Sequence, residues 1–507
     1  MDDNKTNLEN NQTQPSSGYE TVTIDDKLNQ NNADSGNLQP EEVAPDVTSP
    51  DISTTTMPEP FPTSEEPPAI YEENKNKYLV IGGVVIVFIL IFLVLLALFR
   101  PKTPISQQSI NLTYWGLWED KEIYAPLINA YQIKNPNVKI DYQKKSILDY
   151  REKLIVRSQN GQGPDIFRFH NTWIPQLKAN DETILSALPT EIMTAEEYKK
   201  TFYPVIQKDL NINGRYYGLA LEIDGLVLVI NEGLFKKAGI TSPPTSWTED
   251  LIEIVNKLSV RDGNKQLITA GIALGTAENI DHFSEIFGLL LVQNGGSLSK
   301  LDSPEAAQAL EIYRRFAEPP TNYWDETMPN STTAFIQEKV AMILVPSWQI
   351  LNIKAINPDI KLKVVPVPKG PQGTQISIAN YWVEGVSKYS KNQVEAWKFL
   401  KYLSEKEQMS KLYEMQAKTR LFGEPYSRID LGATLAQHEF LGAVITQANN
   451  FISLPIVSKT QDNGLNDGII TYLKDAINAT SQGVAYSEAL NNAKKGIDQL
   501  FLRYKIQ

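Results

Sequence analysis

The feature that most constrains this chain is an apolar run, Leu79–Phe99, whose 21 residues carry no charge. A helix of this length spans about 30 Å at about 1.5 Å per residue, which is the hydrocarbon thickness of a bilayer. Cleavable signal peptides lie at the N-terminus, have a shorter apolar core and end in small residues. This run has none of these three properties. The sequence therefore predicts a membrane anchor helix over 77–100, with a buried core helix as the alternative. Two basic residues flank each end of the run, so charge does not orient it.

The segment before the run is polar, acidic and rich in proline. Residues 1–77 hold four Lys, no Arg and sixteen acidic residues, and thus the whole formal net charge of −12. Residues 1–76 contain nine Pro and three aromatics, too little apolar surface to offset the entropy of ordering. We expect a disordered tail, solvated throughout or holding a docking motif. A polar linker, 101–109, would follow the anchor.

The rest of the chain carries equal numbers of basic and acidic side chains, so it offers no basic field for nucleic acid. The chain has no Cys, which excludes disulfides and thiolate chemistry. Its three His are not paired at helical spacing, which disfavours a metal centre. We predict no metal, no cofactor and a near-neutral partner.

The body opens with alternating strand and helix patterns that predict β-α-β-α-β, typical of a doubly wound α/β sheet. The expected elements are strand Ile110–Tyr114, helix Glu119–Asn135, strand Val138–Tyr142, helix Leu148–Gln159 and strand Pro164–Phe169. Asn213-Gly214 further on is a hairpin signal. Ligands of open α/β sheets bind beyond the carboxyl ends of the strands.

Aromatic, polar and acidic side chains follow these strand ends. The candidates are Trp115, Trp118, Glu119 and Asp120 after the first strand, Trp173 after the third, and Glu222 and Asp224 in the interrupted apolar run 219–230. Apolar ring faces beside fixed hydrogen-bond acceptors suit a neutral polyhydroxylated ligand. Two of these acids could instead act as a glycosidase pair, but the sequence supplies no distance between them. No nucleophile elbow, P-loop or nucleotide fingerprint is present, and we predict that the chain is not an enzyme.

Five stretches resemble the family 1 extracellular solute-binding proteins, the sugar-binding class of ABC transporters that includes maltose-binding protein. They are YWGLWEDKEIYAPLINAY, GPDIFRFHNTW, RYYGLALEIDGLVLVINEGLFKKAGI with PPTSW after it, AFIQEKVAMILVPSW and KNQVEAWKFLKYL. The resemblance covers roughly 110–507. It implies two α/β lobes joined by three hinge crossings, the periplasmic-binding-protein-like fold, with a ligand in the cleft. The first lobe would comprise 110–220 plus 385–425, and the second 221–384 plus 426–507.

The resemblance also implies positions for ligand contacts. Glu119 and Asp120 resemble polar residues after the first strand that bond sugar hydroxyls, Glu222 matches an acid in the first crossing, and Trp348 falls where relatives stack a sugar. Asn171 and Thr172 fall where the family often has a polar or charged ligand contact, Trp382 lies in the second crossing, and Arg420 near the third is a further candidate. The alignment is weaker for Thr276, Glu278 and Asn279 in the cleft loop of the second lobe. Thr172 stands where maltose binders have Arg, which puts maltose itself in doubt.

The function implied is capture of a carbohydrate, expected to be an oligosaccharide, and its delivery to the permease subunits of an ABC importer. A solute receptor belongs outside the cell, so the resemblance orients the anchor: a single pass through the plasma membrane, with the tail cytoplasmic and the binding domain extracytoplasmic. Two alternatives stay open. One is a sensor that signals through the tail, and the other is a membrane-anchored enzyme acting on glycans.

Overall fold

The computed structural model describes residues 76–98, 109–177, 183–247, 249–371 and 373–506. The chain forms two compact units, one before residue 100 and one after it. In the first, a single helix is described, α1 (Asn76–Leu98), whose side chains from Val84 to Leu95 are exposed and apolar. Among the residues described, no helix is long and apolar enough to cross a membrane. The end of the predicted anchor and almost all of the predicted tail and linker lie outside the described residues.

The second unit opens with the predicted β-α-β-α-β order, which is confirmed. Its elements are β1 (Ile110–Gly116), α2 (Lys121–Lys134), β2 (Val138–Lys144), α3 (Tyr150–Gln159) and β3 (Ile166–His170). β1 pairs in parallel with both β2 and β3. A fourth strand, β12 (Trp382–Val386), joins antiparallel to β3 and completes the sheet in the order β12-β3-β1-β2.

A second sheet has the order β10-β6-β9. Its strands are β6 (Leu226–Asn231), β9 (Met342–Pro346) and β10 (Leu362–Val365). β6 runs antiparallel to both neighbours, so the expectation of a doubly wound sheet is wrong for these strands. The reason is directional: β6 leads away from the first lobe, whereas β9 returns toward it, and Leu226 pairs with Pro346 where they meet.

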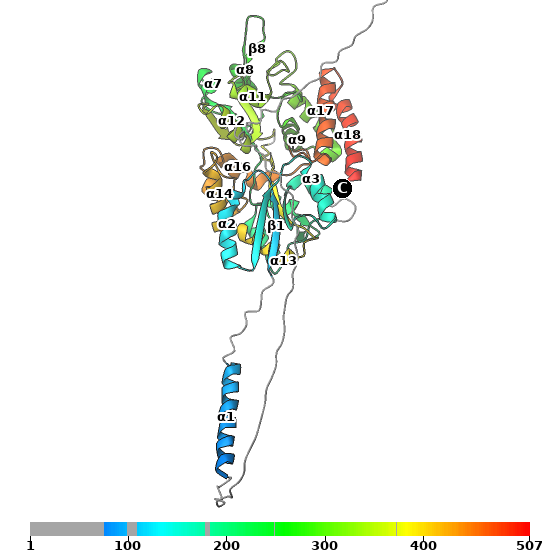
Figure 1. The fold of residues 1–507 in the computed structure, drawn as a ribbon. Coiled ribbons are helices and arrows are strands. Elements are labelled where there is room, and N and C mark those ends of the chain that lie inside the picture. The colour runs from blue at the N-terminus through cyan, green and yellow to red at the C-terminus, as the bar shows by residue number, and fades with distance from the viewer. Residues whose placement is uncertain (1–75, 99–108, 178–182, 248, 372, 507) are drawn as a thin grey trace, which may run out of the picture. The chain divides into compact units, whose positions relative to one another are not determined.

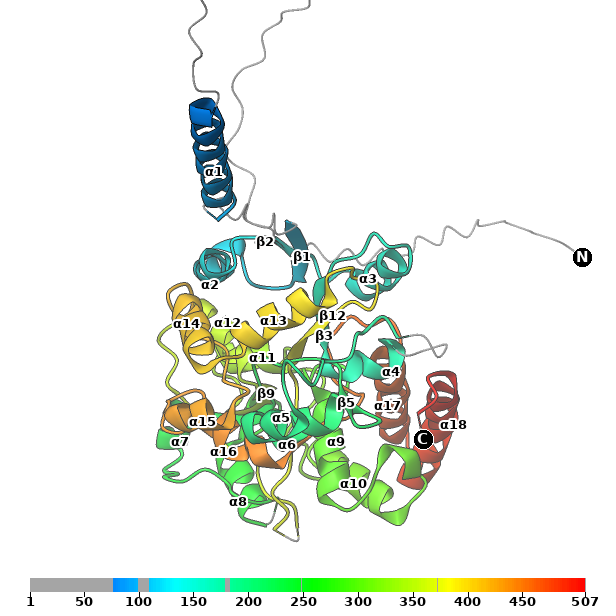
Figure 2. The same cartoon turned by 90° about the horizontal axis from the view of Figure 1, so that it is seen from below.

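Helices of the second unit pack around the two sheets (Figures 1 and 2). α2, α13 (Gln393–Leu403) and α14 (Lys406–Ala417) contact one another beside the first sheet. α11 (Ser331–Ile336), α12 (Trp348–Ile356) and α16 (Gly442–Gln447) contact strands of the second. The long α17 (Leu465–Ser481) and α18 (Tyr486–Arg503) lie side by side, against α9 (Phe283–Gln293) and α10 (Pro304–Arg314) respectively (Figure 2).

Two local predictions are also confirmed. Asn213 and Gly214 both have positive φ and form the tight turn between β4 (Asn211–Ile212) and β5 (Arg215–Tyr216). A type I′ hairpin needs this conformation at both central positions. The interrupted apolar run is strand only from Leu226 on, because Glu222 and Asp224 take part in a crossing between the sheets.

Remaining shorter helices of the second unit are α4 (Ile174–Leu177), α5 (Ala195–Thr201), α6 (Pro204–Asp209), α7 (Glu232–Lys237), α8 (Glu249–Leu258) and α15 (Ile429–Gly432). Remaining strands are β7 (Val260–Arg261), β8 (Leu267–Thr269), β11 (Ser377–Ile378) and β13 (Phe451–Ile452). β11 pairs in parallel with β13 beside the crossings.

Candidate functional site

Three described segments connect the part of the chain around the first sheet with the part around the second. They are 219–225, 377–381 and 425–428, and they pair with one another or with nearby strands through the bridges Leu219–Glu384, Gly225–Ala379, Glu222–Tyr426 and Phe202–Arg428. We call them the first, second and third crossings. These bridges supply hydrogen-bond partners for the backbone of the crossings. They also bring the residues that flank the three segments into one region.

The first-lobe wall of this region is a cluster of aromatic rings centred on Trp382. The strand pairing sets Trp382 opposite His170, the last residue of β3. The Trp382 ring meets the rings of Trp118, His170 and Trp173 edge-to-face, with centroids 5.6, 5.0 and 5.3 Å apart. Trp173 is fully buried, whereas Trp118 is 44% exposed. Trp118 also has φ of 60°, which costs energy in a residue with a side chain and marks a position held by its surroundings.

The second-lobe wall presents Trp348, and backbone hydrogen bonds position it. β9 ends at Pro346, and the next residues begin α12. Asp224 of the first crossing accepts the N–H groups of Ser347 and Trp348, both at 3.1 Å, and the Ser347 hydroxyl at 2.9 Å. It also accepts the N–H of Gly225 at 2.7 Å. Burial raises the pKa of Asp224 to about 7, against the effect of these hydrogen bonds.

The two walls meet through the second crossing. The N–H of Asn380 donates to the Asp224 carbonyl at 2.8 Å, and the Asn380 side-chain oxygen lies 3.1 Å from His170 Nε2. One residue thus joins the anchor of Trp348 to the cluster around Trp382. Burial lowers the pKa of His170 to about 4, so its ring is neutral at pH 7 and its Nε2–H donates to Asn380.

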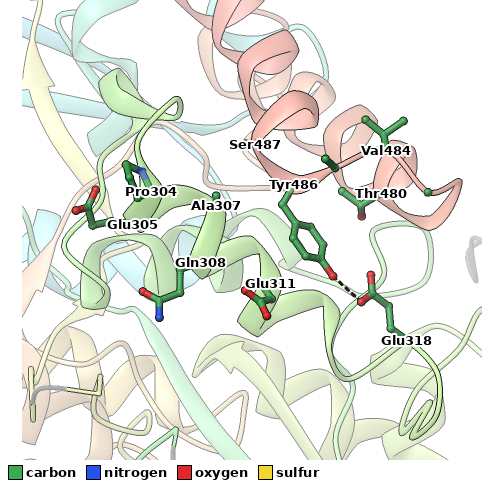
Figure 3. A pocket seen from close by; sticks show the side chains of 12 residues that line it. Pro304, Glu305, Ala307, Gln308, Glu311, Glu318, Thr480, Val484, Tyr486 and Ser487 are labelled. Atoms are coloured by element: carbon green, nitrogen blue, oxygen red, sulfur yellow. Dashed lines mark hydrogen bonds between the residues drawn. The ribbon is translucent and has the colours of Figure 1, made fainter.

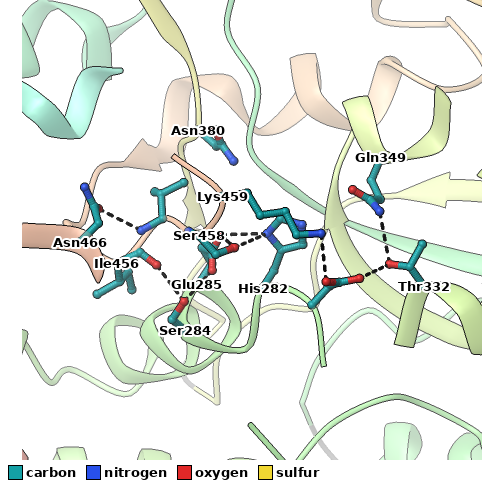
Figure 4. Close-up of polar contacts among 12 residues, drawn as sticks. His282, Ser284, Glu285, Thr332, Gln349, Asn380, Ile456, Ser458, Lys459 and Asn466 are labelled. Carbon is teal, nitrogen blue, oxygen red and sulfur yellow. Dashed lines mark hydrogen bonds and ion pairs between the residues drawn. The ribbon is translucent and has the colours of Figure 1, made fainter. Parts of the chain in front are cut away.

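A polar network that includes His282, Glu285, Ser458 and Lys459 (Figure 4) lies against one side of Trp348. The His282 ring lies 5.8 Å from the Trp348 ring, and the Lys459 ammonium lies 5.9 Å from its centroid and 2.9 Å from Asp281. Glu285 accepts His282 Nδ1 at 2.9 Å, the Ser458 N–H at 2.9 Å and the Ser458 hydroxyl at 2.8 Å. Burial alone would raise the pKa of Glu285, but these donors outweigh it and hold the pKa below its usual value. None of these five network residues was predicted, because they come from the start of α9, the two residues before it and the 453–464 segment, which carry no motif.

Asn171 and Thr172 bind the same C-terminal part of the chain. Asn171 donates to Ser453 at 2.8 Å and to Asp209 at 3.2 Å. The Thr172 hydroxyl contacts His170 Nδ1 at 2.8 Å and accepts from Asn466 at 2.9 Å. Both side chains are buried, so they tie the first-lobe wall to the region around β13 and α17.

The predicted acids Glu119 and Glu222 face inward, whereas Asp120 faces outward. Glu119 accepts from Gln416 at 2.9 Å and pairs with Arg420 at 3.2 Å, and burial raises its pKa. Glu222 accepts the Trp382 N–H at 3.0 Å. Asp120 is exposed and pairs with Lys144 at 2.8 Å.

Trp115, Thr276 and Glu278 each contact residues other than Trp118, Trp348 and Trp382. Trp115 is buried, with the Lys145 ammonium 4.6 Å from its ring centroid. Thr276 bonds to Asn279 at 2.6 Å and accepts from Trp324 at 3.1 Å. Glu278 is exposed and pairs with Lys474 at 2.8 Å.

A cavity of about 840 Å³ lies elsewhere, between α10 and the turn from α17 to α18 (Figure 3). Tyr486 and Glu318 bond across it at 2.6 Å, and no predicted site residue lines it. In the described part of the chain, no group of three or more His, Cys, Asp or Glu is placed to hold a metal ion.

Two sheets joined by three crossings, with aromatic residues on either side, define the class of two-lobed binding proteins. The family model described as bacterial extracellular solute-binding protein matches residues 116–410, and the chain belongs to this family. Membership in a family of binding proteins confirms the prediction that the chain is not an enzyme.

Among relatives, the maltodextrin-binding protein of Bacillus subtilis is 22% identical over 330 residues, which is 62% of this chain and 74% of that protein. The maltotriose-binding protein of Pyrococcus abyssi is 22% identical over 297 residues, 56% of this chain and 59% of that protein. The sugar-binding protein MalE of Xanthomonas citri has a similar structure, with TM-score 0.63, 17% identity, and coverage of 78% of this chain and 98% of that one. The maltose-binding protein MalE of Listeria monocytogenes gives TM-score 0.62 and 20% identity, covering 78% and 98%. These structures confirm the periplasmic-binding-protein-like fold.

Proposed function

We propose that this chain is a receptor that captures a neutral carbohydrate, most simply an oligosaccharide, between Trp118 and Trp382 on one side and Trp348 on the other. The observation that carries the proposal is the meeting of these two aromatic walls at Asp224 and Asn380. Aromatic rings pack against the C–H faces of sugars, while fixed polar groups receive the hydroxyls. The names of the relatives agree, since they specify maltodextrin, maltotriose and, in Streptococcus mutans, multiple sugars.

The predicted residues take four roles in this proposal. Trp118, Trp348 and Trp382 stack on sugar rings, because each has an exposed or half-buried ring. Asp120 bonds hydroxyls at the rim. The buried residues Trp115, Glu119, Asn171, Thr172, Trp173, Glu222 and Asp224, with Arg420, shape the walls and crossings that support the rings. Thr276 and Glu278 would contact only a ligand long enough to extend past Trp348.

Binding would favour closure of the two lobes. A ligand that touches both walls stabilises the closed arrangement only through contacts absent from the open one. Closure would present both lobes together to the permease subunits of an ABC importer, to which the receptor delivers its ligand.

We further propose that the apolar segment 77–100, which extends beyond the described residues, anchors the receptor in the plasma membrane, with residues 1–76 cytoplasmic and the binding unit outside. An anchor confines the receptor to the surface that holds the importer and so raises its effective concentration there. Protease added to intact cells should remove the binding unit. Protection of this unit would contradict the orientation without touching the proposed ligand.

The ligand is tested by titrating the purified full chain with mono- and oligosaccharides while following tryptophan fluorescence. A saturable change with no product formed is the expected result. The sugar that binds with the highest affinity identifies the ligand class. No change across the panel contradicts carbohydrate binding and would favour a non-sugar ligand or a sensor role. Mass spectrometry of the ligand that copurifies with the chain then identifies the alternative.

A further inference from the structure

Charged side chains are concentrated beneath the crossings, beside the first-lobe wall. Four carboxylates and two guanidiniums lie together there: Glu119, Glu222, Glu384, Glu424, Arg168 and Arg420. Most of them are buried, and Arg168 and Glu384 are only 3% and 1% exposed. Carboxylates therefore outnumber cations in a region that excludes water, which is costly unless one of them is neutral.

The ion pairs show which carboxyl group lacks a cation. Arg168 pairs with Glu384 at 2.7 Å. Arg420 pairs with Glu424 at 2.8 Å and with Glu119 at 3.2 Å. Glu222 has no ion pair among these and accepts only the Trp382 N–H at 3.0 Å.

Glu222 instead meets a second carboxyl group. Its side chain is in hydrogen-bonding contact with that of Glu424, and both line a cavity of about 10 Å³. Such a space holds one water molecule at most, so there is little room for water between the two groups. Two carboxyl oxygens in hydrogen-bonding contact require a proton between them.

The environment decides which group holds the proton. Burial raises the pKa of Glu222, and the neighbouring Glu424 raises it further. Burial acts on Glu424 in the same direction, but Arg420, the hydrogen bond from Glu222 and Arg168 bring its pKa below the usual value. Glu222 is therefore the acid that donates, and Glu424 is the carboxylate that accepts.

These two residues connect different parts of the hinge. Glu222 belongs to the first crossing, and Glu424 immediately precedes the third. The backbones already pair beside them, because the Ile223 N–H donates to the Pro425 carbonyl at 2.9 Å. The other oxygen contact of Glu222, to Trp382, reaches the start of β12 at the end of the second crossing.

We propose that one proton shared by Glu222 and Glu424 clasps the first and third crossings and holds Trp382 in place, which makes the hinge sensitive to pH. Glu222 is then a positioning residue for the aromatic wall and not a contact for the ligand. Above the pH at which the proton is lost, the buried Glu222 and the partly exposed Glu424 are two adjacent carboxylates, and their repulsion weakens the contact between the crossings. The proposal concerns the hinge alone and holds whatever the ligand is.

Other titratable groups that act on this pair come from each packed element. Glu119 beyond β1, Arg168 on β3, Arg420 after α14 and Asp224 in the first crossing interact with the pair directly, and Tyr413 and Tyr426 line the same small cavity. Tyr124 on α2 and Glu384 on β12 act on Arg168. Because the pKa of Asp224 is about 7, its titration is common to the wild type and a Glu222→Gln variant, and the comparison between the two isolates the pair. Burial raises the pKa of Tyr124, Tyr413 and Tyr426, so these phenols stay neutral while the carboxyl pair titrates.

The test compares thermal unfolding of the purified full chain and its Glu222→Gln variant from pH 5 to pH 9. A raised folded-state pKa contributes stability below the usual pKa of Glu, and this contribution is lost as the pH rises through the folded value. Gln has the shape of a protonated Glu and keeps a donor at every pH. We expect the unfolding midpoint of the wild type to fall relative to E222Q as the pH rises, by about 2 °C or more at pH 9.

Glu424→Gln is the matched variant, since the same chemical change removes the acceptor and the partner of Arg420. We expect E424Q to have a lower midpoint than the wild type throughout the pH range. Glu253→Gln is the control, because Glu253 forms an exposed pair with Lys257 at 2.6 Å on α8 and should leave the midpoint unchanged. The proposal is overturned if E222Q fails to fold, if its pH profile parallels the wild type, or if E222Q and E424Q are destabilised alike.

Discussion

The two walls of the site hold their aromatic residues by different means. On the first-lobe wall, Trp382 is surrounded by other rings and contacts three of them within 5.6 Å. On the second-lobe wall, Trp348 is fixed by its backbone to the Asp224 carboxylate, and its ring meets one His ring and one ammonium. The packing energy of Trp382 is shared among several rings, so the loss of one ring leaves the others in contact. Trp348 depends on one buried carboxylate with four donors, so the loss of that carboxylate removes all four hydrogen bonds at once. The comparison predicts that the second wall is the more sensitive to loss of one side chain.

The largest effect should come from Asp224→Ala. This change leaves the buried N–H groups of Gly225, Ser347 and Trp348 without their acceptor. At about 1–3 kcal/mol for each buried donor left unsatisfied, we expect the free energy of unfolding to fall by about 3–5 kcal/mol. Denaturant unfolding measures this free energy. A loss below about 1 kcal/mol would contradict the prediction that the second-lobe wall is the more sensitive of the two.

The second-largest effect should be a loss of stability at low pH through His170 on the first-lobe wall. The folded-state pKa of His170, about 4, lies below the usual value of 6.5, so its contribution to stability is intact above pH 6.5 and is lost as the pH falls toward 4. Linkage makes this loss on the order of 2–3 kcal/mol. His170→Gln should flatten the profile over that range in unfolding measured against pH. An unchanged slope in the variant would show that His170 does not titrate as a buried neutral ring.

Loss of the Trp348 ring should weaken ligand binding and leave the stability of the fold nearly unchanged. Trp348 is half-buried, so Trp348→Ala should cost about 1–3 kcal/mol of binding free energy while the unfolding midpoint changes little. Isothermal titration calorimetry with the sugar found by fluorescence measures the affinity. Trp247→Phe is the control, since Trp247 bonds to Gln293 in the second lobe, at 2.7 Å, and should leave the affinity intact. Equal affinity in W348A would remove Trp348 from the site.

The smallest effect should be at Trp118. Trp118→Gly removes an exposed ring and also relieves the left-handed backbone at φ of 60°. We expect binding to weaken by about 1 kcal/mol, with the free energy of unfolding unchanged or slightly raised. A comparison with Trp118→Ala separates the two effects, because Ala loses the ring and keeps the strain. If the two variants are equally stable, the backbone of Trp118 is not strained.

Much of the first lobe could be predicted from the sequence. Alternation at period two and helical spacing are local signals, and they gave strands and helices within a few residues of β1, α2, β2, α3 and β3. The same signals placed Trp118 and Trp173 beyond strand ends, where the structure brings them to Trp382. The direction of β9 had no such signal, because antiparallel and parallel neighbours differ in long-range pairing and not in local pattern.

The roles of the acids could not be predicted either. Glu119, Asp120, Glu222 and Asp224 look alike in the sequence as acids near strand ends. In the structure Asp120 meets solvent, Glu119 meets Arg420, Glu222 meets Glu424, and Asp224 anchors Trp348. Their partners are up to 297 residues away in the sequence, as for Glu119 and Gln416.

The sequence by itself therefore determined the charge-balanced body, the α/β opening, the family and the rings available for a ligand. Those properties depend on composition and on neighbours along the chain. Only the tertiary structure decided which carboxyl groups support the hinge and which rings face each other. Burial and the distance to a distant partner set the charge state and the accessibility of a side chain, and both arise only when the crossings bring remote segments together.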